Sequence, residues 1–162
     1  MRTDYGSVQF VGYESQHVDF LPVYQDSNYT AQDLRDKLDS MIEAAVTAES
    51  GLVPGAYFSL LVVGHADRVD IAGWTSEQKR ELELTNSEKR AEDAEAYFFN
   101  EMVARLTAQG FEAPASAQLL GTVQTRRVAC GSAQLFFPNP GNDEGQRRAN
   151  RRVEFFGAAF SP

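Results

Sequence analysis

The chain has 162 residues, of which 43% are hydrophobic, and a formal net charge of −8. This length and composition suffice for one hydrophobic core, so a single domain over residues 1–162 is expected. The negative charge argues against sequence-independent binding of nucleic acid or anionic lipid, which would be repelled at long range. The single cysteine, Cys130, excludes an internal disulfide framework and a cysteine-rich zinc site.

The sequence shows no signal for a membrane location or for export. It has no run of about 18 apolar residues that could span a bilayer, so no membrane insertion is expected. Residues 1–6 lack the apolar core and the cleavage pattern of a secretion signal. These observations predict a soluble chain without an evident export route.

The first third of the chain predicts a strand, a helix and a second strand. Residues 7–19 mix apolar and polar side chains as a half-buried strand does, and residues 1–15 are a candidate N-terminal arm. After a loop at 22–29, Thr30 offers a hydroxyl cap for an amphipathic helix. The apolar run 57–63 then predicts a strand buried on both faces.

The rest of the chain predicts a long helix and two further strands. The strongest helical pattern covers residues 86–109 and is preceded by a candidate inserted loop near 68–85, of which 76–84 is helical or partly ordered. Residues 117–130 and 152–160 predict strands. The whole order predicts an α/β fold, a two-layer βαβαββ sandwich with helices on one face of a mixed sheet.

Three short motifs follow one another along these elements. They read Gly64-His65-Ala66-Asp67, Ser87-Glu88-Lys89-Arg90-Ala91 and Asn150-Arg151-Arg152-Val153-Glu154. The first places a carboxylate after a strand, and the second places a guanidinium one turn inside a predicted helix. Asp67 and Arg90 are therefore expected to face one site, either as a ligand-binding pair or as a structural ion pair.

The three motifs, in this order, resemble the OmpA-like C-terminal domain, the peptidoglycan-associating module of outer-membrane proteins, Pal lipoproteins and flagellar stator subunits. The resemblance implies a domain of the cell envelope or periplasm that binds, without cleaving, the peptidoglycan stem peptide at diaminopimelate. It assigns the grip on that zwitterionic residue to Asp67 and Arg90, with Arg147, Asn150 and Arg151 supporting the pocket walls and the last strand. One acidic and one basic partner suit a free amine beside a carboxylate.

The sequence also departs from the family pattern. Ala66 replaces a threonine, Glu83 an asparagine, Asn86 a leucine and Gln146 a glycine, and the stretch between Asp67 and Arg90 is longer than usual. Glu83 is expected either to repel a ligand carboxylate or to pair with Arg90. The added length is expected to cover the site or to form a protein interface.

Other side chains allow more than one interpretation. We interpret His65 as a packed histidine and not as a metal ligand, because the only other histidine, His17, is far away in sequence. We interpret the cluster from Arg147 to Arg152 as a partly solvated edge of the domain and not as a phosphate-binding site. Trp74 suits packing on its own domain, sugar stacking or a protein interface. No metal or cofactor is expected.

Two other classes of function compete with a cell-wall module. Without an export signal, an OmpA-like domain is also expected in a phage tail, a baseplate or a contractile injection particle, where it would contact protein partners or the wall from outside. An enzyme is not expected, because the sequence has no dense ligand cluster, no Ser-His-Asp spacing and no nucleotide-binding loop.

Overall fold

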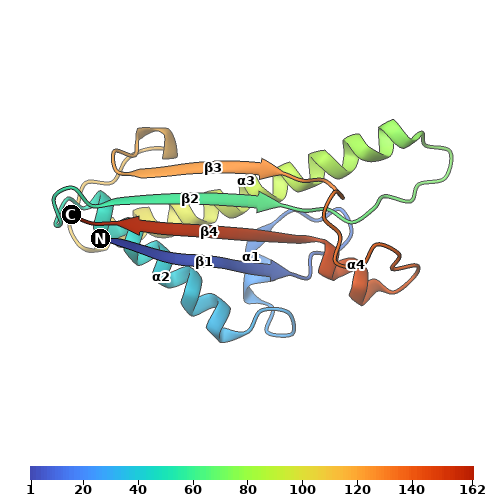
Figure 1. Cartoon of the computed structure of the whole chain (residues 1–162), viewed down its shortest axis with the longest axis horizontal. Helices are drawn as coiled ribbons and strands as arrows, with labels where there is room; N and C mark the ends of the chain where they lie inside the picture. Colours follow the sequence, from blue (N-terminus) through green and yellow to red (C-terminus); the bar gives the residue numbers. More distant parts are fainter.

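The computed structural model describes residues 1–162 as a four-stranded mixed sheet with helices packed on it (Figure 1). The elements in chain order are β1 (Arg2–Val11), α1 (Phe20–Gln25), α2 (Gln32–Glu49), β2 (Tyr57–Gly64), α3 (Ser76–Ala108), a 3-10 turn (Ala117–Leu119), β3 (Val123–Ala129), α4 (Glu144–Asn150) and β4 (Arg152–Phe160). The strands lie in the order β1-β4-β2-β3, and only β2 and β3 run parallel. The predicted α/β sandwich is confirmed.

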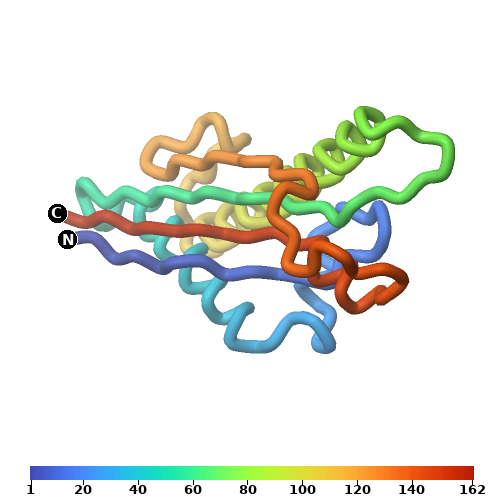
Figure 2. The backbone as a smooth tube through the Cα atoms, turned by 45° about the vertical axis from the view of Figure 1, so that its right-hand side comes forward, coloured from blue at the N-terminus to red at the C-terminus, as the bar shows by residue number.

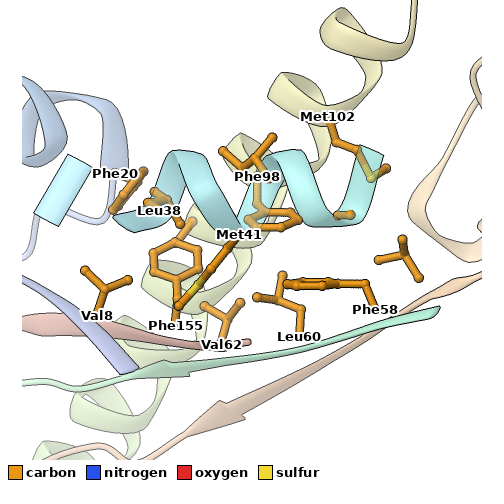
Figure 3. Packing of buried hydrophobic residues seen from close by; sticks show 14 of the residues in the cluster. Val8, Phe20, Leu38, Met41, Phe58, Leu60, Val62, Phe98, Met102 and Phe155 are labelled. Atoms are coloured by element: carbon orange, nitrogen blue, oxygen red, sulfur yellow. The ribbon is translucent and has the colours of Figure 1, made fainter. Parts of the chain in front are cut away.

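The hydrophobic core lies between the sheet and helices α1, α2 and α3. Alternate residues of a strand point to one face, so Phe58, Leu60 and Val62 of β2 lie beside Phe155 of β4, beneath the helices (Figure 3). The helices close this layer with a second set of buried side chains, including Leu38, Met41, Phe98 and Met102. The alternating apolar residues of the strands and the helically spaced apolar residues of the helices therefore pack into one core.

The opposite face of the sheet carries no helix over most of its length (Figure 1). Ser59 of β2 is exposed there, and Tyr57 and Leu61 are half-buried. The prediction that this strand is buried on both faces is therefore wrong: the apolar run supplies one core face and one partly open face.

The N-terminal residues form an edge strand. β1 pairs antiparallel with β4 from Arg2↔Phe160 to Val11↔Arg152. The candidate arm at 1–15 is therefore wrong, since most of it is hydrogen-bonded in the sheet. The chain ends lie next to each other, with the Ser161 amide donating to the Met1 carbonyl at 2.8 Å (Figure 2).

The long helix differs most from expectation. α3 is continuous over 33 residues, so the segments predicted at 76–84 and 86–109 are one element. It begins with a capping box in which Thr75 accepts from the Gln78 amide and the Gln78 side chain accepts from the Thr75 amide. Arg90 therefore lies in the middle of the helix and not one turn from its start. No helix has the length and apolar character needed to cross a membrane.

The remaining differences concern short elements and one cap. Thr30 does not cap α2, because its hydroxyl donates to the Val23 carbonyl at 2.8 Å, and Ala31 holds the cap position without a side-chain bond. The short helices α1 and α4 were not predicted. β3 begins at Val123, after the 3-10 turn, and so occupies only the second half of the predicted 117–130 strand.

Candidate functional site

The three motifs converge at the end of the sheet where β2 stops and β4 begins (Figure 1). A pocket of about 380 Å³ opens there. It is lined by Ser15, Gln16, Ala66, Asp67, Arg68, Val69, Asp70, Ile71, Asn86, Arg90, Asn142, Glu144, Arg147 and Arg151. Four arginines and three carboxylates belong to this lining, so the pocket is strongly polar and carries both signs of charge.

Gly64 explains how α3 comes close enough to contribute Arg90. A Cβ atom at Gly64 would lie 1.8 Å from the backbone oxygen of Ser87 and 3.2 Å from Cβ of Ala91. Only a glycine allows this approach of strand and helix. The Ser87 hydroxyl, in turn, accepts from the Gly131 amide at 2.9 Å. The first two motifs are therefore in direct contact.

Asp67 is buried, with 5% of its surface exposed, and is held by residues of α4. Its Oδ1 accepts from Nδ2 of Asn150 at 2.9 Å, and its Oδ2 accepts from Nη1 of Arg147 at 2.8 Å. Nη2 of Arg151 lies 3.9 Å from the same Oδ2. The carboxylate is thus oriented on one wall of the pocket with its charge partly compensated.

Arg90 is the largest fully buried side chain of the protein, at 1% exposure. Its Nε donates to the His17 carbonyl and its Nη1 to the His65 carbonyl, both at 2.9 Å, and its guanidinium carbon lies 5.0 Å from the centre of the Tyr13 ring. Burial lowers the pKa of Arg90 to about 10, with opposition from Tyr13 and Asp67, so the group stays charged at pH 7.

One nitrogen of Arg90 remains available. Nη2 makes no hydrogen bond within the protein, and it is not among the fully enclosed polar atoms without a partner. Asp67 and Arg90 line the same pocket but form no ion pair within 4.0 Å. Their arrangement therefore leaves room between an acid and a base.

Glu83 does not line the pocket, and both roles expected for it are wrong. Its Oε1 accepts from the Val69 amide at 2.7 Å, and its Oε2 accepts from the Ser132 hydroxyl. It neither faces the cavity nor pairs with Arg90. Its buried carboxylate instead fixes the loop that follows Asp67 against α3.

His65 is a packed histidine on the other side of the sheet end. Its Nε2 lies 3.1 Å from Oε1 of Glu154 without the alignment of a hydrogen bond, and Nη1 of Arg90 binds only its backbone carbonyl. Burial and the charge of Arg152 lower the pKa of His65 to about 4, although Glu154 opposes the shift. The imidazole is neutral at pH 7. No three His, Cys, Asp or Glu side chains converge as metal ligands would.

The arginines at positions 147, 151 and 152 divide between two tasks. Nη1 of Arg151 donates to the Tyr13 carbonyl at 3.3 Å and to Oε1 of Glu144 at 2.6 Å, and Nε of Arg147 donates to the Gly141 carbonyl at 2.7 Å. Arg152 points away from the pocket and bonds Glu154. The first two arginines therefore shape the pocket, and the third does not reach it.

Sequence reasoning missed the contribution of the turn at 14–17. Gln16 has φ of 60°, the only positive φ outside glycine, and with Ser15 it forms one wall of the pocket. No local pattern indicated this, because the turn reaches the pocket through the bond from Arg90 to His17. Asn86, noted only as a departure from the family, also lines the cavity, and its side chain makes no hydrogen bond within the protein.

No protein-family model and no curated protein matches the sequence. Among solved structures, the chain is similar to the periplasmic domain of Helicobacter pylori MotB, with 15% identity and a TM-score of 0.36, over 93% of this chain and 74% of that one. A second crystal form, of the MotB C-terminal domain, gives 16% identity and a TM-score of 0.38 over 91% and 83%. Likenesses at this level carry no argument for family or function.

Proposed function

We propose that this protein is a non-catalytic peptidoglycan-binding module that receives the diaminopimelate residue of a stem peptide between Asp67 and Arg90. The observation that carries the proposal is that Arg90, whose Nη2 has no partner within the protein, lines the same pocket as Asp67. The order and composition of the three motifs, which resemble those of OmpA-like domains, support it. The same assignment makes the cell envelope the expected location.

Arg90 and Asp67 suit the two charged groups of a zwitterion. Arg90 is held by two carbonyls and is therefore preorganised to offer a charge-assisted bond to a carboxylate without losing side-chain freedom. Asp67 has one strong bond to each carboxylate oxygen, which leaves lone pairs for an ammonium group. Arg147 and Asn150 act as positioning residues for that carboxylate.

A pull-down with insoluble diaminopimelate-type peptidoglycan tests the proposal. Arg90→Lys and Asp67→Asn keep size and most packing, and each is expected to reduce retention at least about tenfold, since each removes one charge-assisted contact. Matched controls are Arg126→Lys on β3 and Asp4→Asn near the chain ends, both of exposed residues outside the pocket. Circular dichroism checks that each variant is folded.

The ligand offers a second control. Lysine-type peptidoglycan lacks the carboxylate that Arg90 is expected to bind, so retention on it should be weak for the unaltered protein. Equal retention of all variants, or equal retention of the unaltered protein on both types of peptidoglycan, contradicts the pocket assignment. The proposal also expects muropeptides to be recovered unchanged by mass spectrometry. The alternative of a phage-tail or injection-particle component has no support from the structure or the comparisons.

A further inference from the structure

The loop that leaves the pocket leads directly to the only tryptophan of the protein. Ile71 lines the pocket, and three residues later the Trp74 amide donates to the Ile71 carbonyl at 3.3 Å. Three residues of chain span at most about 10 Å. Trp74 is 42% exposed. The backbone of Trp74 therefore lies close to the pocket lining. The loop that carries it and the start of α3 project beyond the sheet (Figure 2).

A second, shallower hollow of about 360 Å³ lies beside Trp74. Its other lining residues are Gln78, Glu81, Leu82 and Thr85, which follow one stripe of α3. The hollow therefore combines an aromatic ring with an amide, a carboxylate and a hydroxyl, and it contains no cation. This composition suits a neutral ligand with both C–H faces and hydroxyl groups, as a pyranose ring has.

The hollow and the pocket are adjoining surfaces of one rigid element. Thr85 lines the hollow, and the next residue, Asn86, lines the pocket, so the two cavities flank the same turn of α3. Trp74 directly precedes the capping box between Thr75 and Gln78, which fixes the start of the helix. The Glu83 bond to Val69 holds the other end of the loop. The aromatic ring is thus carried by a loop that is tied down at both ends.

We propose that the Trp74 hollow binds a sugar ring of the glycan to which the stem peptide is attached. The inference rests on the proposed function and extends it, because a ligand held by Asp67 and Arg90 would present its glycan next to the pocket. The indole face would cover the apolar face of the sugar. The free amide nitrogen of Gln78 and the polar ends of Glu81 and Thr85 would bind hydroxyl groups.

The single tryptophan makes the test direct, because all indole fluorescence comes from this hollow. The probes are a disaccharide-tetrapeptide muropeptide and the corresponding free tetrapeptide, both with diaminopimelate. The muropeptide is expected to shift the emission and the free peptide to leave it nearly unchanged. By calorimetry, Trp74→Ala is expected to weaken muropeptide binding about tenfold, a factor equal to about 1.4 kcal/mol, and to leave tetrapeptide binding unchanged.

The controls distinguish sugar binding at Trp74 from peptide binding between Asp67 and Arg90. Trp74→Phe keeps an aromatic face and should restore most of the muropeptide affinity. Leu84→Ala removes a more exposed apolar side chain from the same helix, at 50% exposure, and should change neither affinity. If Trp74→Ala binds both ligands as the unaltered protein does, the sugar site is wrong while the pocket stands. If the unaltered protein binds neither ligand, the proposed function itself fails.

Discussion

Two clusters of ionisable side chains, most of them buried, lie at the same end of the sheet, and they differ in which donors they leave unpaired. The pocket cluster consists of Asp67, Arg90, Arg147 and Arg151, and the sheet cluster consists of His65, Arg152 and Glu154. Both come from the same sequence motifs, since Arg151 and Arg152 are neighbours in the chain. They part because successive residues at the start of a strand point to opposite sides.

In the sheet cluster, Arg152 has no nitrogen to spare. It donates to Glu154, to the Asn150 carbonyl and to the Gln134 carbonyl, and its guanidinium carbon lies 3.7 Å from the centre of the Phe136 ring. Arg90 in the pocket cluster makes two such bonds and keeps one nitrogen free. A buried arginine is therefore a candidate for ligand binding when one of its three guanidinium nitrogens has no acceptor within the protein.

The largest expected effect comes from Gly64, which both clusters depend on. Gly64→Ala would place a methyl group 1.8 Å from the Ser87 backbone oxygen, which cannot be relieved without moving α3 off β2. We expect a loss of at least about 3 kcal/mol in the free energy of unfolding. Urea denaturation measures it. Gly121→Ala is the control, because the nearest atom to its Cβ is a flexible carboxylate oxygen at 3.8 Å, and an equal loss there contradicts the close-contact explanation.

The second prediction separates the clusters. Arg152→Ala should cost about 3 kcal/mol of stability, because it leaves the buried Glu154 carboxylate without its cation. Peptidoglycan retention by the folded fraction should not change, since Arg152 lies outside the pocket. Adding Glu154→Gln should recover part of the stability. A parallel loss of retention and stability would show that the clusters are not independent.

The third prediction concerns pH. His65 has a folded-state pKa of about 4, below its ordinary value of 6.5, so the unfolded chain binds a proton between these values before the folded one does. The contribution of neutral His65 to the free energy of unfolding is therefore fully present above about pH 6.5. It is lost as the pH falls toward 4, by at most about 3 kcal/mol. His65→Gln should flatten this part of the stability profile. An unchanged slope would contradict a neutral, buried imidazole.

The smallest effect on stability is expected in the pocket itself. Asn86→Ala removes a side chain without internal hydrogen bonds, so unfolding should change by less than about 0.5 kcal/mol. Ligand affinity should nevertheless fall about threefold to tenfold if the amide contacts the ligand. Asn100→Ala, at an exposed position of the same helix, is the matched control. A stability loss without an affinity loss would make Asn86 a structural residue.

The sequence predicted the layers of the fold better than the contacts of the site. β4 matches the predicted strand 152–160, whose short run of residues contains Val153, Phe155 and Phe156, side chains that favour strands. The start of α3 was predictable as well: Thr75 and Gln78 have the spacing of a capping box, and Asp143 and Gln146 have a similar spacing at α4. Both spacings lie beside stretches of glycine and polar residues that are typical of loops.

The partners of the site residues were not predictable from local patterns. Arg90 donates to the carbonyl of a residue 73 positions away. Every residue has a backbone carbonyl, so the amino-acid sequence does not indicate which one will accept the bond. The interpretation of Asp67 and Arg90 as a direct ion pair is wrong, because Asp67 binds Arg147 and Arg90 binds the His65 carbonyl. The resemblance to a family named the two residues, and only the three-dimensional arrangement shows which of their atoms are free.

The position of the chain ends has a practical consequence. Met1 and Ser161 are hydrogen-bonded neighbours at the end of the sheet away from the pocket (Figure 2). A tag or surface linkage at either end would therefore leave the cavity facing outward. A short peptide bridge between the ends would also permit circular permutation, with new ends opened in the exposed turn at residues 51–55. The pocket could then be displayed from a scaffold without altering a single residue that lines it.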